Sequence, residues 1–122
     1  MRVLVTGATA PLGRALVAAL AADAAVEQVL ATGVEADGDL AGPRVTYLPF
    51  DLTRPRDVHD LLSGPARRLG IDAVVHTALH RSAKDGGPRI HAENVETTRE
   101  LLLGCTGHPT IRRFVYRSAA EV

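Results

Sequence analysis

The sequence predicts an α/β fold built on a doubly wound parallel sheet with strand order 3-2-1-4-5. Five short apolar runs with little polar alternation are typical of strands covered on both faces, and helical periodicity lies between most of them. These runs are residues 3–5, 26–32, 45–50, 71–76 and 112–117. A glycine-bearing turn joins the first run to the first helix, at the edge where parallel sheets bind ligands.

Residues 3–20 form the predicted first strand, turn and helix. Thr6 and Gly7 end the strand, and Pro11 suits the first turn of the helix because its missing N–H costs nothing there. Apolar side chains at helical spacing form one stripe that we expect to face the sheet, namely Leu12, Ala15, Leu16, Ala19 and Leu20. Unpaired N–H groups and the positive end of the helix dipole meet at the turn, which predicts a site for an anion such as pyrophosphate.

Small residues occupy three positions of this turn, Gly7, Ala10 and Gly13. Gly7 provides the tight turn and Gly13 lets the helix press against the strand. The methyl of Ala10 stands where dinucleotide sites usually carry a glycine, so we expect weakened phosphate binding. The alternative is a glycine-containing turn that binds nothing.

Composition excludes several classes of function. The 122 residues suffice for one domain, and 14 basic residues balance 14 acidic ones, so no net charge attracts nucleic acid or an anionic membrane. No apolar run approaches the length of a membrane span. The single cysteine, Cys105, fits a reducing compartment and a role in helix packing. We therefore expect a cytoplasmic protein with no membrane or nucleic-acid partner.

The end of the second strand bears on the choice of cofactor. Dinucleotide sites hold the ribose with an acidic residue about 20 positions after the last glycine, and that count ends at Gly33. The acidic candidates are displaced to Glu35 and Asp37, and Asp37 also fits a solvated turn. No arginine or lysine lies between Arg14 and Arg44 to bind a 2′-phosphate, which favours NAD over NADP.

Asp51 follows the third strand at the carboxyl edge. It could accept a hydrogen bond from an adenine amino group, or it could be a local turn or capping residue. Thr53 is expected to cap a helix that has Pro55 in its first turn. Three apolar residues supply the predicted buried face of that helix, namely Val58, Leu61 and Leu62.

The fourth strand ends at His76, followed by Thr77 and Ala78, whose small side chains would let a ribose and nicotinamide lie against the backbone. His76 and His80 form a pair without a third ligand, so His76 is interpreted as structural rather than as a zinc ligand. Residues 79–89 are interpreted as a substrate lid or a long connector.

Residues 90–105 are helical in pattern. The predicted buried face has four members, namely Val95, Thr98, Leu102 and Cys105. Asn94 lies one residue before that face, and a mid-helix asparagine is unfavourable unless its side chain has a hydrogen-bonding task.

Five segments in order along the chain resemble the markers of one enzyme family. They are residues 5–13 (Val-Thr-Gly-Ala-Thr-Ala-Pro-Leu-Gly), 51–52 (Asp-Leu), 75–78 (Val-His-Thr-Ala), 93–98 (Glu-Asn-Val-Glu-Thr-Thr) and 113–118 (Arg-Phe-Val-Tyr-Arg-Ser). Together they resemble the N-terminal, Rossmann-like part of an extended short-chain dehydrogenase/reductase of the NAD-dependent epimerase/dehydratase family. The similarity spans the whole chain, so residues 1–122 are interpreted as an incomplete NAD(P)-binding domain.

The resemblance implies site residues. The cofactor would contact Gly7, Thr9, Ala10, Pro11, Leu12, Gly13, Glu35, Asp51, Leu52, Thr77 and Ala78. Ser118 would be catalytic, one position before the family's substrate-positioning hydroxyl residue, which is replaced here by Ala119; Asn94 would support it. The nicotinamide dinucleotide would be NAD, the small-molecule substrate is unidentified, and no metal is expected.

Three departures weaken the resemblance, at Ala10, Gly33 and Ala119. In addition, the family's Tyr-x-x-x-Lys pair is missing, since neither Tyr47 nor Tyr116 has a lysine four residues on. One hypothesis is the cofactor-binding part of an oxidoreductase whose catalytic and substrate portion lies outside this chain. The other is a non-catalytic protein that senses a dinucleotide or serves as an interaction surface. With the sheet ending at the fifth strand, an open edge is expected to cause self-association.

Overall fold

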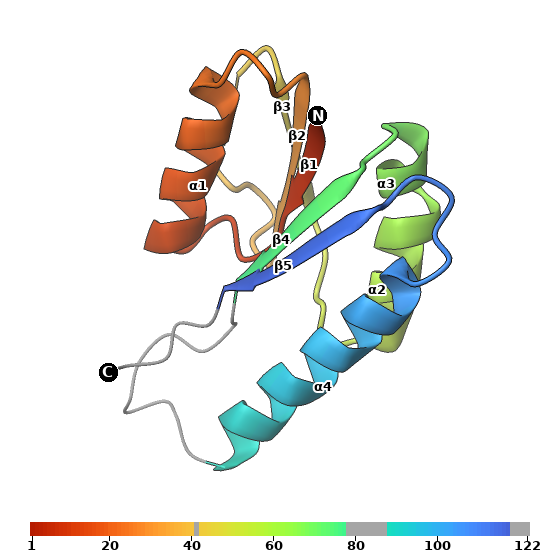
Figure 1. Ribbon diagram of the computed structural model, residues 1–122. Coiled ribbons are helices and arrows are strands. Elements are labelled where there is room, and N and C mark those ends of the chain that lie inside the picture. The colour runs from red at the N-terminus through yellow and green to blue at the C-terminus, as the bar shows by residue number, and fades with distance from the viewer. Residues whose placement is uncertain (41, 78–87, 118–122) are drawn as a thin grey trace.

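A computed structural model describes residues 1–40, 42–77 and 88–117, with residues 88–93 described as backbone only. Five parallel strands form one sheet in the order β3-β2-β1-β4-β5, as the sequence predicts (Figure 1). The strands are β1 (Arg2–Val5), β2 (Gln28–Gly33), β3 (Val45–Pro49), β4 (Ala73–Thr77) and β5 (Arg113–Arg117). β2 begins two residues later than expected because the Val26 amide donates to Asp23 O in a turn.

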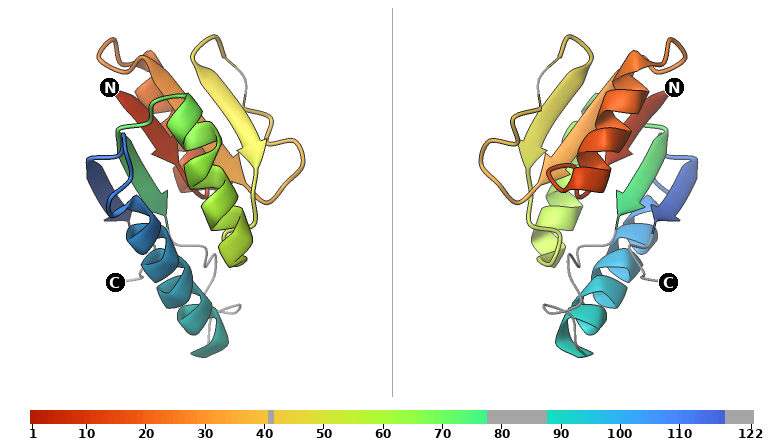
Figure 2. Two further views of the ribbon diagram at one scale, coloured as in Figure 1. Left: turned by 90° about the vertical axis from the view of Figure 1, so that its right-hand side faces the viewer. Right: turned by 90° about the vertical axis from the view of Figure 1, so that its left-hand side faces the viewer.

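Helices cover both faces of the sheet. They are α1 (Pro11–Ala22), α2 (Pro55–Ser63), α3 (Pro65–Arg68) and α4 (Pro88–Cys105). In Figure 2, α1 lies on one face and α2, α3 and α4 lie on the other. The fold is therefore doubly wound, with α1 alone on its face among the described elements. None of the described helices is both long and apolar enough to span a membrane.

Two apolar cores result from this layering. The larger lies between the sheet and α2, α3 and α4, and includes Leu4, Leu30, Leu61, Val74 and Leu101, each fully buried. The smaller lies under α1 and is built on alternate residues of the same strands, including Val3, Val5 and Val29. Because parallel strands are buried on both faces, their sequences are apolar without alternation.

The predicted buried stripe of α1 is wrong in part, because only Leu16 and Leu20 of its five members pack against the core. Leu12, Ala15 and Ala19 are exposed, whereas Gly13 and Val17 are buried and Leu16 and Leu20 are half-buried. The inner face is thus rotated by about one residue. α1 is apolar on several sides, so its hydrophobic pattern does not fix which side is buried. The side that carries Gly13 lies against the turn, because glycine has no side chain to prevent a close approach.

The predicted face of α4 is also wrong in part, since Cys105 is buried as expected but the other three members are not. Val95 and Leu102 are exposed, and Thr98 is half-buried. The buried positions of this helix are Asn94, Thr97, Leu101 and Cys105. Two polar residues on the inner face hide its periodicity, because a hydrophobic pattern does not count them.

Of the other local predictions, those for α2 and Cys105 are confirmed and the one for Thr53 is wrong. Val58, Leu61 and Leu62 form the buried face of α2, and Cys105 packs in the core, where burial raises its thiol pKa to about 11. Thr53 does not cap α2, since its hydroxyl donates to Asp51 Oδ1 at 2.6 Å.

Candidate functional site

The turn after β1 has no room for a side chain at Gly7 or at Gly13. Gly7 has φ +61°, and a Cβ on it would lie 2.1 Å from Thr77 Oγ1. A Cβ on Gly13 would lie 2.0 Å from the carbonyl oxygen of Gly7. The predicted roles of both residues, a tight turn and a close helix contact, are therefore confirmed by the geometry.

Ala10 precedes α1 as its N-cap residue, with φ −76° and ψ 159°. Any L-residue adopts these angles, so the backbone does not demand glycine here. The N-cap makes no side-chain hydrogen bond to the start of α1. The first N–H groups of a helix have no intrahelical partner, so this end of α1 can receive an anion. Pro11 and Leu12, predicted cofactor neighbours, lie exposed at this end.

A pocket of about 140 Å³ lies beside the turn at the carboxyl edge of the sheet. Its lining includes Gly7, Thr9, Thr32, Gly33, Val34, Phe50, Asp51, Leu52 and Thr53. The structure thus brings together predicted site residues from the ends of β1, β2 and β3. In the described part of the chain, Thr32 Oγ1 is the buried polar side-chain atom that has no hydrogen-bond partner, so the pocket lining also holds an unused polar group.

Glu35 lies two residues after Gly33, the position at which the sequence pattern expects an acid, yet its carboxylate lies beside that position in the structure. Thr9 Oγ1 donates to Glu35 Oε2 at 2.6 Å, and Tyr47 donates from its hydroxyl to the Glu35 carbonyl at 2.5 Å. A Cβ on Gly33 would lie 2.9 Å from Thr9 and 3.2 Å from Glu35 Oε2. The carboxylate therefore lies next to the space that an acidic side chain at residue 33 would enter.

The surroundings of Glu35 affect Tyr47. Burial, together with the charges of Glu35 and Asp37, raises the pKa of the Tyr47 phenol. Its hydroxyl therefore stays protonated and continues to donate to the loop. Asp37 accepts the amide of Asp39 at 2.9 Å, which agrees with a turn role.

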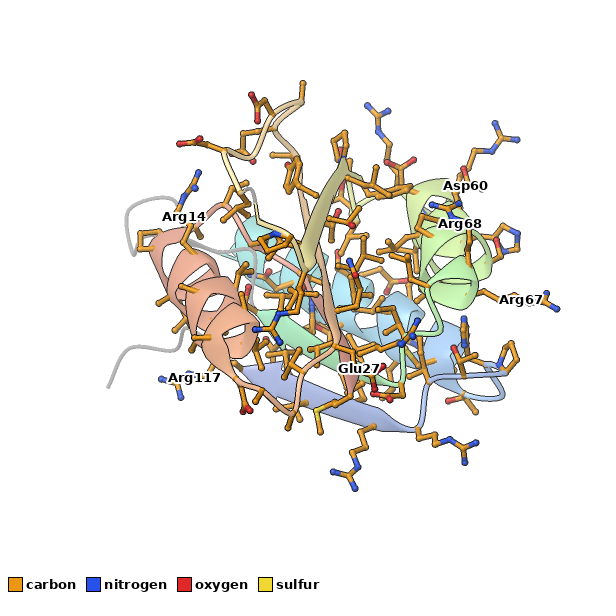
Figure 3. The ribbon with its side chains drawn as sticks, turned by 90° about the horizontal axis from the view of Figure 1, so that it is seen from above. Arg14, Glu27, Asp60, Arg67, Arg68 and Arg117 are labelled. Atoms are coloured by element: carbon orange, nitrogen blue, oxygen red, sulfur yellow. The ribbon has the colours of Figure 1, made fainter. Side chains whose placement is uncertain are left out.

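Arg14 is a neighbour of this site that sequence reasoning missed. Its Nε donates to the Thr9 carbonyl at 2.9 Å, and Figure 3 shows its side chain at the exposed end of α1. Arg14 lies in the first turn of α1 rather than near the end of the second strand, where a cation that binds a 2′-phosphate is expected. Its place at the start of the predicted first helix is the sequence signal for it.

Asp51 makes local contacts. Its Oδ1 accepts from the amide and the hydroxyl of Thr53, at 3.1 and 2.6 Å, and its Oδ2 lies 3.5 Å from Arg54 Nε. The amide of Asp51 donates to Asp57 Oδ2 at 2.7 Å. The geometry thus supports the turn interpretation, and Asp51 also lines the pocket.

The end of β4 joins the end of β1 through reciprocal hydrogen bonds. Thr77 N–H donates to Thr6 Oγ1 at 3.1 Å, and Thr77 Oγ1 donates to Thr6 O at 3.0 Å. His76 is 1% exposed, with Nδ1 2.6 Å from Thr6 Oγ1 and Nε2 3.1 Å from Thr98 Oγ1. Burial lowers the pKa of His76 to about 4, so the ring is neutral.

The remaining predicted residues do not form a metal or catalytic cluster that the structure describes. Asn94 is buried on the inner face of α4. Ala78 and Ser118 lie outside the described residues. Among residues 1–40, 42–77 and 94–117, whose side chains the structure describes, no group of three or more potential metal ligands occurs.

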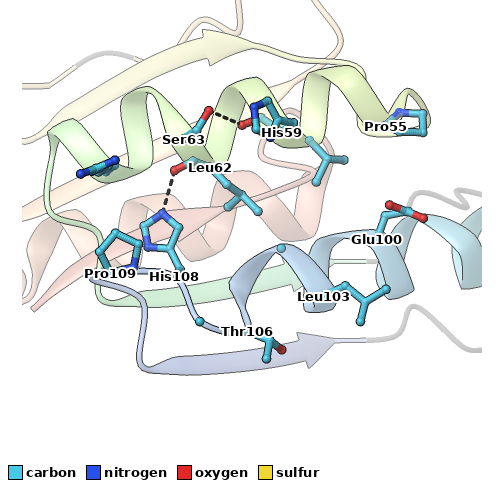
Figure 4. Close-up of a pocket in the computed structure, with 13 residues that line it drawn as sticks. Pro55, His59, Leu62, Ser63, Glu100, Leu103, Thr106, His108 and Pro109 are labelled. Atoms are coloured by element: carbon cyan, nitrogen blue, oxygen red, sulfur yellow. Dashed lines mark hydrogen bonds between the residues drawn. The ribbon is translucent and has the colours of Figure 1, made fainter.

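A larger pocket, of about 470 Å³, lies away from the turn between α2, α4 and the loop after α4 (Figure 4). Two of its polar side chains are used internally: His108 Nε2 donates to Leu62 O at 2.7 Å, and Ser63 donates to His59 O at 2.7 Å. Nδ1 of His108 accepts the Thr110 amide at 3.1 Å. Volume alone therefore does not make this pocket the functional site.

Comparison with known proteins identifies the family. Residues 3–122 match the sequence profile described as "NAD dependent epimerase/dehydratase family". The chain belongs to this family. A curated protein, the hybrid PKS-NRPS synthetase tasS of Hapsidospora irregularis, is 36% identical over an alignment of 111 residues. The alignment covers 84% of this chain and 2% of that protein.

Solved structures agree with the family. Uronate dehydrogenase from Agrobacterium tumefaciens is 27% identical with a TM-score of 0.69, over 93% of this chain and 39% of that chain. The Bordetella bronchiseptica enzyme WbmH, in complex with NAD+, is 22% identical with a TM-score of 0.70, over 94% and 38%. A short-chain dehydrogenase/reductase superfamily protein from Agrobacterium tumefaciens with bound NAD is 28% identical with a TM-score of 0.67, over 95% and 32%. The chain therefore spans less than half the length of these proteins.

Proposed function

We propose that residues 1–122 form an NAD(P)-binding unit that holds a nicotinamide dinucleotide at the turn between Gly7 and Gly13. The observation that carries this proposal is that the turn borders the pocket at the carboxyl ends of β2 and β3. The pyrophosphate would lie at the start of α1 and the adenosine in the pocket, with Leu52 and Asp51 beside it. Family membership and the NAD complexes of similar structures support this assignment.

NAD is proposed as the preferred cofactor because of Glu35. Its carboxylate, beside Thr9 and Gly33, would accept hydrogen bonds from the ribose hydroxyls and repel a 2′-phosphate. Arg14 is held nearby through Thr9 and is the cation that could oppose this preference. The balance of these two charges therefore decides selectivity.

Isothermal titration with NAD+, NADH and NADPH tests both parts. We expect the wild-type chain to bind NADH more tightly than NADPH, and Glu35→Gln to reduce that ratio about tenfold. Asp37→Asn is the matched control, since Asp37 serves a local turn, and its ratio should stay unchanged. No binding of any dinucleotide at millimolar concentration would contradict the proposal.

In this proposal the bound nicotinamide supplies hydride-transfer chemistry, while the residues of this chain bind and orient it. Thr77 and Ala78 would lie against the nicotinamide ribose, Asn94 would support the site from α4, and Ser118 would contact the substrate. Within these 122 residues no Tyr-x-x-x-Lys occurs, so we assign them no proton-transfer step. The substrate is a small molecule of unassigned class.

A second candidate is a non-catalytic dinucleotide sensor, which Ala10 favours because its methyl stands at the phosphate position. The two candidates differ in their need for a proton donor. Reading the coding sequence beyond Val122 separates them: a Tyr-x-x-x-Lys there favours the enzyme, and an in-frame stop favours the sensor.

We also propose cytoplasmic location and self-association. The buried Cys105 thiol suits a reducing compartment. β5 is one of the two edge strands of the described sheet, and its Val115 and Tyr116 are 55% and 43% exposed. An exposed strand edge with apolar side chains pairs readily with another chain.

A further inference from the structure

His76 connects three elements that meet beneath the dinucleotide-binding turn. Its ring nitrogens lie 2.6 Å from Thr6 Oγ1 on β1 and 3.1 Å from Thr98 Oγ1 on α4. The ring also stacks on Tyr116 of β5, with centroids 5.3 Å apart and planes at 27°, and Phe114 lies at 6.1 Å. Both nitrogens and one face of the imidazole are therefore engaged by the fold.

The hydrogen-bond pattern points to one tautomer. Thr6 Oγ1 accepts the amide proton of Thr77, and Nδ1 of His76, 2.6 Å away, is an acceptor within reach of the Thr6 hydroxyl proton. Nε2 then carries the proton and donates to Thr98. In this arrangement each of these groups is satisfied, and a neutral ring supplies one donor and one acceptor.

Thr6 passes this constraint to the turn. It is the residue immediately before Gly7, and its carbonyl accepts from the Thr77 hydroxyl. That hydroxyl lies where a Cβ on Gly7 would fall. Next along the turn, the Ala8 amide donates to Thr32 O at 3.0 Å and the Ala10 amide to Gly7 O at 3.2 Å. A shift of Thr6 would therefore move the start of the turn.

We propose that His76 is a positioning residue for dinucleotide binding, which holds the Thr6–Gly7 backbone in place through Nδ1 while Thr98 and Tyr116 orient its ring. The inference rests on the proposed function, since it assumes that the turn receives the cofactor. His76 is buried and does not line the pocket, so its effect passes through Thr6.

The binding test compares variants of the full 122-residue chain by titration with NADH. His76→Phe keeps a ring but loses both hydrogen bonds, and it should raise Kd about tenfold. His76→Asn keeps one donor and one acceptor and should recover most of that loss. His59→Phe, the same change at an exposed position of α2, should bind as the wild type does.

Coupling to Thr6 gives a sharper test. If His76 acts through Thr6, the double variant His76→Phe/Thr6→Val should bind no more weakly than the weaker single variant. Multiplying effects would overturn the proposed route. Thr98→Val, which removes only the Nε2 partner, should raise Kd by a smaller factor than His76→Phe.

Amide hydrogen exchange separates this inference from the proposed function. The amides of Ala8 and Ala10 should exchange faster in His76→Phe than in His59→Phe, and His76→Asn should restore their protection. If the wild type binds no dinucleotide, the proposed function fails, and the exchange rates still decide whether His76 positions the turn. Wild-type exchange and wild-type Kd in His76→Phe would overturn the inference.

Should His76→Phe fail to fold, nitrogen NMR of the wild type decides. We expect a neutral His76 ring at pH 7 with the proton on Nε2. An Nδ1 resonance typical of a nitrogen without a hydrogen bond would overturn the inference.

Discussion

The methyl group of Ala10 is expected to affect the affinity for the proposed cofactor without preventing the turn from folding. Its backbone angles suit any residue, so the turn forms without a glycine there. The cofactor, however, needs the backbone to approach phosphate closely, and the middle glycine usually permits this. The fold therefore accepts alanine at this position, while in the proposed site its methyl group is expected to weaken phosphate binding.

Ala10→Gly should therefore strengthen NADH binding, by about threefold to tenfold. Glycine is also a better N-cap residue than alanine, so α1 should not be weakened. Ala18→Gly, on the exposed side of the same helix, is the control and should leave Kd unchanged. Titration calorimetry measures both, and equal Kd values for Ala10→Gly and the wild type would refute the role given to the methyl.

His76 makes stability depend on pH. Burial lowers its pKa to about 4, against about 6.5 in the unfolded chain, so the unfolded state binds the extra proton first. Its contribution is fully present above pH 6.5 and falls by about 3 kcal/mol as the pH drops to 4.

Urea unfolding between pH 7 and pH 4 measures this loss. His76→Asn should show a correspondingly shallower decline than the wild type, while exposed His59→Asn should follow the wild-type curve. Parallel curves for His76→Asn and the wild type would mean that the buried ring is not the titrating group.

At the scale of the element, α2 buries the apolar face that the sequence predicts, whereas α1 and α4 bury a face next to the predicted one. On α4 the buried positions are Asn94, Thr97, Leu101 and Cys105. Hydrophobic periodicity detects a helix well, yet it orients the helix poorly when polar or small residues lie on the inner side. Close packing, rather than hydrophobicity, selects the face here.

Adjacent leucines on α4 test this orientation. Leu101 is fully buried and Leu102 is 47% exposed. Leu101→Ala should lower the free energy of unfolding by about 2–5 kcal/mol, whereas Leu102→Ala should cost less than about 1 kcal/mol. Chemical denaturation compares the two, and a larger loss at Leu102 would favour the face expected from periodicity.

At the scale of the whole molecule, the described helices cover the two faces of the sheet unevenly. α1 packs over β1 and β2, and the same face of β4 and β5 carries the half-buried Val75 and the exposed Val115. This apolar strip lies at the strand edge of the described sheet. It is the surface on which we expect self-association.

Val115→Lys should reduce self-association, because a charge on an edge strand opposes pairing with another chain. Val34→Lys is the control, since Val34 is similarly exposed, at 57%, in the loop after β2. Size-exclusion chromatography with light scattering over a concentration series measures the mass. A wild type that stays monomeric throughout would contradict the proposal.

The sequence by itself determined the strand order, the glycine turn and the family. Those signals are local: apolar runs, glycine spacing and motifs a few residues long keep their meaning without knowledge of the fold. The predicted order 3-2-1-4-5 and the roles of Gly7 and Gly13 were therefore confirmed.

Only the tertiary structure decided which helix faces are buried, how Glu35 reaches Thr9 across 26 residues and how His76 reaches Thr6 across 70. Such contacts depend on which chain segments the sheet brings together, and they leave no periodic signal in the sequence. The hydrogen bonds that join these residues therefore became evident only with the ends of β1, β2 and β4 placed side by side.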